Sequence, residues 1–184
     1  MNIALRRPLT VDEYLAWADA QPERQRSELI NGQIVAMAAE RVGHNHTKGR
    51  VYLALTQAMK SAGIAGEVFM DGMSVPIDDH TAYEPDALVR CGTPLPFNQL
   101  KVVDPVIVVE VKSPTTAHMD TSAKLVGYFK LASVQHYLFI DPDERTVRHY
   151  WRAADWTIAE KTMTTEELDL TPPGIKVLAS DLLG

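Results

Sequence analysis

The pattern of apolar and polar residues predicts a protein of mixed helices and strands. Two segments carry apolar residues at helical spacing, which predicts helices over residues 46–62 and 120–132. The β-branched run from Val106 to Val111 is typical of a central strand buried on both faces. Three further strands are expected, over residues 66–75, 82–90 and 136–140. The predicted order from residue 46 onward is therefore α-β-β-β-α-β.

Shorter elements are predicted on either side of this core. Thr10 and Glu13 form a capping box that should begin a helix reaching about Ala20. Asn31-Gly32 lies between two apolar runs and predicts a hairpin, because both residues tolerate a positive φ. A final hairpin is expected over residues 145–161. We predict an α/β fold with a mixed, α+β-like sheet, an N-terminal helix and hairpin and a C-terminal hairpin, in one domain over residues 1–184.

Composition narrows the class of protein. The chain is 46% hydrophobic and carries a net charge of −6, which argues against indiscriminate nucleic-acid binding, since such binding depends on Lys and Arg. The lone Cys91 excludes an intrachain disulfide and indicates a reducing compartment. No signal peptide or stretch of about 20 apolar residues is found, so we expect a cytoplasmic protein without a membrane span.

Charged residues interrupt the central strand at Glu110 and Lys112. Residues two apart in a strand point to the same face, so this pair should share a face at the strand's end. A buried charge is costly unless it is paired or binds a metal. Taken alone, the two residues are better explained by a local ion pair at the strand's exposed end, so they do not establish a site by themselves.

Asp86 strengthens the metal hypothesis. It follows Pro85 at the start of the preceding predicted strand, where the alternative interpretation is a turn-capping aspartate. If the two strands are neighbours, Asp86, Glu110 and Lys112 converge. Two carboxylates and a backbone carbonyl suit Mg²⁺ or Mn²⁺, and a nearby lysine can assist hydrolysis.

These residues resemble a known family. Pro85-Asp86 followed by Glu110-Val111-Lys112 on an α-β-β-β-α-β scaffold resembles the PD-(D/E)XK nuclease superfamily. Further blocks resemble the Uma-two family of bacterial restriction-endonuclease-like proteins: residues 27–37, His44-Asn45, Glu84-Pro85-Asp86, residues 108–114, Asp120, Lys124, Tyr128 and residues 137–141. The resemblance covers roughly residues 10 to 180.

The resemblance implies roles for individual residues. Asp86, Glu110 and the Val111 carbonyl would ligate the metal, and Lys112 would serve the attacking water. Glu28 would supply the additional acidic residue of the catalytic set. The commonest superfamily pattern places that glutamate on the helix before the core strands, whereas Glu28 precedes the Asn31-Gly32 hairpin, so a strand-edge charge is an equal alternative.

Two more residues are candidates for nucleic-acid contact. His44 stands near the start of the predicted helix 46–62, where free N–H groups favour anions, although capping or surface residues are common there. Lys124 either points toward the centre and meets a phosphate, or pairs with Asp120 four residues earlier.

The sequence thus favours a divalent-metal-dependent endonuclease that hydrolyses DNA phosphodiester bonds with Mg²⁺ or Mn²⁺. Cutting both strands needs two centres, so a homodimer is expected. One alternative is a catalytically silent nuclease-fold module that binds nucleic acid or protein, which the acidic charge favours. Another is a hydrolase of small phosphoesters, because the chemistry is the same and only the cleft differs.

Overall fold

The computed structural model describes residues 7–21, 26–112 and 121–184. The described helices are α1 (Val11–Asp19), α2 (Val42–Ser61), α3 (Thr121–Lys130) and α4 (Ala179–Leu183). The described strands are β1 (Ser27–Ile30), β2 (Gln33–Ala36), β3 (Gly66–Met70), β4 (Val75–Asp78), β5 (Thr81–Tyr83), β6 (Ala87–Cys91), β7 (Ile107–Val111), β8 (His136–Asp141), β9 (Thr146–Arg152), β10 (Ile158–Met163), β11 (Glu167–Leu170) and β12 (Ile175–Leu178). No described helix is long and apolar enough to cross a membrane.

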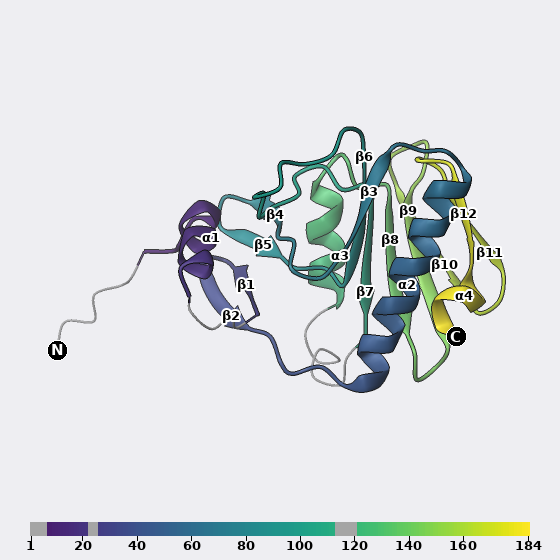
Figure 1. The fold of residues 1–184 in the computed structure, drawn as a ribbon, viewed down its shortest axis with the longest axis horizontal. Coiled ribbons are helices and arrows are strands. Elements are labelled where there is room, and N and C mark those ends of the chain that lie inside the picture. Colours follow the sequence, from purple (N-terminus) through teal and green to yellow (C-terminus); the bar gives the residue numbers. More distant parts are fainter. Residues whose placement is uncertain (1–6, 22–25, 113–120) are drawn as a thin grey trace.

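A six-stranded sheet forms the centre, in the order β10-β9-β8-β7-β6-β3. Neighbouring strands in this sheet are antiparallel, except that β7 and β8 are parallel. Parallel strands need a crossover connection, and α3 lies in the segment that connects β7 to β8. In Figure 1, α3 and a four-stranded sheet of β1, β2, β4 and β5 cover one face of this sheet, and α2 covers the other with β11, β12 and α4. The mixed sheet agrees with the predicted fold class.

Strand β7 shows why the central run is apolar throughout. Its residues Ile107, Val109 and Val111 face the cluster that includes α2, whereas Val108 faces the cluster that includes Tyr128 of α3. Both faces are covered, so alternate positions are equally buried. Glu110 shares the face of Val108 and therefore points toward α3.

A second sheet, β2-β1-β5-β4, supports the N-terminal part. The predicted capping box of Thr10 and Glu13 is present at α1. Asn31 and Gly32 both have positive φ in the β1–β2 turn, as the hairpin prediction requires. A Cβ on Gly32 would lie 2.3 Å from Pro8 Cβ, so the close approach of the chain also needs glycine here.

Several predicted boundaries were wrong. Helix α2 begins at Val42, not at residue 46, although Arg41 gives it no side-chain cap. The predicted strands 66–75 and 82–90 are broken by turns and become β3 to β6. The hairpin β11–β12 and helix α4 were not predicted. Asp120, and with it the predicted start of α3 and the Asp120–Lys124 pair, lies outside the described residues.

Candidate metal centre

Asp86 and Glu110 are brought together by the antiparallel pairing of β6 and β7. Ala87 pairs with Val109, so the start of β6 lies beside the end of β7. Asp86 Oδ2 accepts a hydrogen bond of 2.7 Å from the Val111 backbone N–H. The Asp86 side chain is only 7% exposed. The sheet therefore places an acidic side chain from each strand at the same end.

Helix α3 and strand β1 complete the surroundings of Glu110. Lys124 Nζ donates to Glu110 Oε1 and to Glu28 Oε1, both at 2.8 Å. Tyr128, one turn further along α3, donates its hydroxyl to the same Glu110 oxygen at 2.7 Å. Glu28 also accepts the backbone N–H of Glu84 at 2.9 Å. Both carboxylates are thus held around one partly buried ammonium.

The pKa values of Glu110 and Lys124 are shifted by burial and by neighbouring charges. Burial raises the pKa of Glu110 to about 7; Lys124 opposes the rise, and the negative charges of Asp86 and Glu28 add to it. Burial works against the charge of Lys124, but Glu110 and Glu28 outweigh it and raise its pKa. Lys124 is therefore a firmly charged cation here.

A second ion network lies on the other side of Asp86. Lys48 on α2 is fully buried, contacts Glu40, and donates to Asp71 at 2.5 Å. Arg26 binds Glu40 and lies 2.8 Å from Asp71 and from Glu84. Lys48 Nζ is also 3.9 Å from Asp86 Oδ1, which joins this network to the centre.

Negative charge exceeds positive charge in the joined networks. Among the described residues, the acids are Glu28, Glu40, Asp71, Glu84, Asp86 and Glu110, and the permanent cations are Arg26, Lys48 and Lys124. With all six acids ionised, three negative charges remain uncompensated. Buried charges need compensation, so this composition suits a divalent cation.

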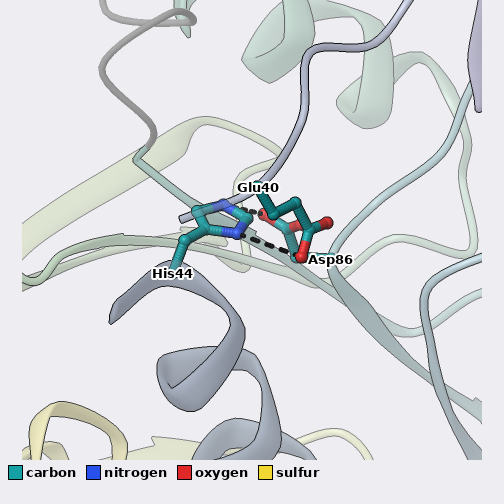
Figure 2. A group of neighbouring side chains, drawn as sticks. All are labelled: Glu40, His44 and Asp86. Atoms are coloured by element: carbon teal, nitrogen blue, oxygen red, sulfur yellow. Dashed lines mark ion pairs between the residues drawn. The ribbon is translucent and has the colours of Figure 1, made fainter. Parts of the chain in front are cut away.

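His44 faces both Asp86 and Glu40, as Figure 2 shows. Its Nε2 is 3.0 Å from the Val111 carbonyl oxygen and 3.4 Å from Asp86 Oδ2, and its Nδ1 is 3.8 Å from Glu40 Oε2. Burial lowers the pKa of His44, but Asp86 and the Val111 carbonyl outweigh burial and raise it. Glu40, His44 and Asp86 offer three potential ligand atoms within 4.8 Å of one another.

Lys112 makes a different contact. Its Nζ donates to Asp141 Oδ2 at 2.6 Å, and this hydrogen bond raises the pKa of Lys112. In the described contacts it is Lys124, and not Lys112, that binds Glu110. The predicted residues Glu28, Asp86, Glu110, Val111, His44 and Lys124 all lie in the centre. His44 faces three oxygen atoms, of Val111, Asp86 and Glu40, that would repel a phosphate.

Sequence reasoning missed the second network. Lys48 follows His44 by four residues and precedes Val51 and Leu55 by three and seven, which places it on the apolar stripe of α2. A lysine on that stripe was a usable signal, because lysine is rarely fully buried without a partner. Glu40 and Asp71 lie in connecting segments and gave no comparable signal.

Comparison with known proteins identifies the family of this chain. A family model described as Uma2, "putative restriction endonuclease", matches residues 11–179. The chain belongs to the Uma2 family. Two relatives in Synechocystis, the uncharacterized proteins sll1609 and slr1290, are each 27% identical to it. The alignments cover 93% and 91% of this chain, and 97% and 87% of the relatives.

A solved structure shares the fold of this Uma2 protein. The crystal structure of a "putative nuclease" from Anabaena variabilis superposes with a TM-score of 0.73 at 20% sequence identity. The match covers 96% of this chain and 98% of the other. The restriction-endonuclease-like fold expected from the sequence is thereby confirmed, and with the family match it makes this a nuclease-like protein.

Proposed function

We propose that this Uma2 protein is a divalent-metal-dependent endonuclease that hydrolyses DNA phosphodiester bonds. The observation that carries the proposal is the convergence of Asp86, Glu110 and Glu28 at one end of the central sheet, where the partly buried ammonium of Lys124 binds the two glutamates. The family match and the excess of negative charge support it. A homodimer would present one such centre to each DNA strand.

The residues have distinct tasks in this proposal. Asp86, Glu110 and the Val111 carbonyl would hold Mg²⁺ or Mn²⁺. When bound, the ion would polarise the phosphate and stabilise the negative charge that develops during hydrolysis. Lys124 holds its proton at Nζ between Glu28 and Glu110 and is the cation best placed to meet that charge. Tyr128 fixes the Glu110 carboxylate by its hydroxyl.

Plasmid nicking tests the proposal. Purified protein is incubated with supercoiled DNA and MnCl₂ or MgCl₂, and Glu110→Gln is expected to lower the nicking rate by at least about 100-fold, the loss typical when an electrostatic group of an active site is removed. Glu160→Gln is the matched control, because Glu160 is exposed on β10. Nicking by Glu110→Gln at the wild-type rate would reject the assignment, with circular dichroism showing that both variants fold.

One observation favours a second function, a catalytically silent module that binds nucleic acid or protein. Lys124 already pairs with both Glu28 and Glu110, and Lys112 is occupied by Asp141. These ion pairs hold the acidic residues together without a metal ion. DNA binding that persists in chelator, together with no uptake of Mn²⁺ in a calorimetric titration, would support this second function over the first.

A further inference from the structure

We propose that His44 is a nitrogen ligand of the divalent ion, beside Asp86 and the Val111 carbonyl, and that it makes the centre prefer a first-row transition-metal ion such as Mn²⁺ to Mg²⁺. This inference rests on the proposed function for the presence of an ion. It goes further in adding a ligand that the Asp86, Glu110 and Val111 set lacks, and in stating which ions the site selects.

The spacing around His44 Nε2 fits coordination. Nε2 lies 3.0 Å from the Val111 carbonyl oxygen and 3.4 Å from Asp86 Oδ2. Neighbouring ligand atoms around a small octahedral ion with bonds of about 2.1 Å are separated by roughly 3.0 Å. A carboxylate, a carbonyl and an imidazole therefore already stand at nearly the separations that a shared ion requires.

The other ring nitrogen provides an independent observation. The His44 side chain is only 9% exposed, and its buried Nδ1 has no hydrogen-bond partner in the described part of the chain. Such an orphan is unusual, because buried polar atoms are normally paired. A neutral imidazole has one N–H, so when Nε2 gives its lone pair to an ion, the proton sits on Nδ1.

Glu40 stands where that proton would need an acceptor. Its Oε2 is 3.8 Å from Nδ1, slightly beyond hydrogen-bond distance, and Figure 2 shows the carboxylate beside that of Asp86, each facing one ring nitrogen. Metal-binding histidines commonly donate their second N–H to a carboxylate, which fixes the ring and its tautomer. Metal uptake would thus give the orphan nitrogen a partner and fix the ring against Glu40 and Asp86.

The nitrogen ligand has a consequence for ion selection. Mg²⁺ prefers oxygen ligands, whereas sites containing imidazole bind transition-metal ions with affinities that rise from Mn²⁺ through Co²⁺ and Ni²⁺. A centre built from Asp86, Glu110 and a carbonyl alone would lack this discrimination. We therefore expect Mn²⁺ to bind at least about tenfold more tightly than Mg²⁺, because even partners outside the ligand set change metal affinity by about 10–100-fold.

Calorimetric titration of the full chain with MnCl₂ and with MgCl₂ tests the inference. His44→Gln should lose at least about tenfold in Mn²⁺ affinity and much less in Mg²⁺ affinity, so that the preference disappears. His46→Gln is the matched control, since His46 is exposed on the same helix. The electron spin-echo signal of bound Mn²⁺ should show nitrogen coupling in the wild type and in His46→Gln, and none in His44→Gln.

The outcomes separate this inference from the proposed function. Mn²⁺ uptake with an unchanged preference and unchanged nitrogen coupling in His44→Gln would overturn the role of His44 and leave the metal centre standing. No uptake of either ion by the wild type would overturn both. Thermal unfolding of each variant checks the fold, and His44→Asn, which also lacks the ring, must repeat the loss for the inference to hold.

Discussion

At the scale of single residues, the two lysines show how far the sequence could lead. Strand periodicity predicts that Glu110 and Lys112 share a face. However, β7 ends at Val111, so Lys112 lies outside the strand and the periodicity does not extend to it. Lys112 binds Asp141 at the end of β8 instead. Lys124 reaches Glu110 only through the packing of α3 on the sheet, which no local pattern in the sequence encodes.

Replacing each lysine distinguishes their roles. Lys124→Met is expected to lower plasmid nicking by at least about 100-fold, because it removes the cation between Glu28 and Glu110. Lys112→Met should cost less than about tenfold, since its ammonium is bound to Asp141. Lys130→Met, at an exposed position on α3, serves as the control. A Lys112→Met protein that is inactive beside an active Lys124→Met protein would return the catalytic role to the motif lysine.

At the scale of elements, apolar periodicity predicted the existence of α2 and α3 but not what each helix places against the sheet. The start of α2 was missed because Arg41 provides no side-chain cap and Gly43 weakens the first turn. His44 therefore lies inside the helix and not before it. In α3, Gly127 marks a close approach: a Cβ there would lie 2.7 Å from Tyr83 Cε2 and 3.1 Å from its hydroxyl.

The close contact between Gly127 and Tyr83 can be tested with a pair of glycine variants. Gly127→Ala should lower the free energy of unfolding by about 1–3 kcal/mol, because Tyr83 is buried against Tyr128 and has little room to yield. Gly49→Ala on α2 meets nothing within 4 Å and should raise the free energy by up to about 1 kcal/mol, from helix propensity alone. Urea denaturation measures both. Equal stabilisation by the two alanines would show that α3 does not depend on the contact with Tyr83.

At the scale of the whole molecule, the order α-β-β-β-α-β could be predicted for the large sheet and its helices (α2, β3, β6, β7, α3 and β8), because each of these elements carries its own periodicity. The β11–β12 hairpin and α4 could not, because each of these two strands has only four residues, too few for a clear alternation of apolar and polar positions. They nevertheless bury Leu168, Leu170, Ile175 and Val177 in the hydrophobic cluster to which α2 and the large sheet also contribute. The fold therefore depends on long-range burial that the local pattern understates.

The large sheet also holds a histidine pair that should make global stability depend on pH. His136 Nδ1 lies 2.9 Å from His149 Nε2, and each residue is 3% exposed. Burial lowers the pKa of both to about 4, with the charge of His136 adding to the effect on His149 and Asp169 opposing it. Only one of the two facing nitrogens can carry a proton, so the pair resists full protonation.

The sign of the effect follows from the two states. Histidines in the unfolded chain have a pKa of about 6.5 and bind protons below that pH. In the folded pair the pKa of each is lowered to about 4, so the pair stays neutral until the pH approaches 4. The neutral pair therefore contributes its full stabilisation above pH 6.5. As the pH drops toward 4, the free energy of unfolding falls by roughly 1.4 kcal/mol per pH unit for each histidine. Urea denaturation between pH 5 and 7 should show this slope roughly halved in His149→Gln and unchanged in His46→Gln. If His149→Gln kept the full slope, the protons taken up on unfolding would have to bind elsewhere, because only one buried histidine would then remain.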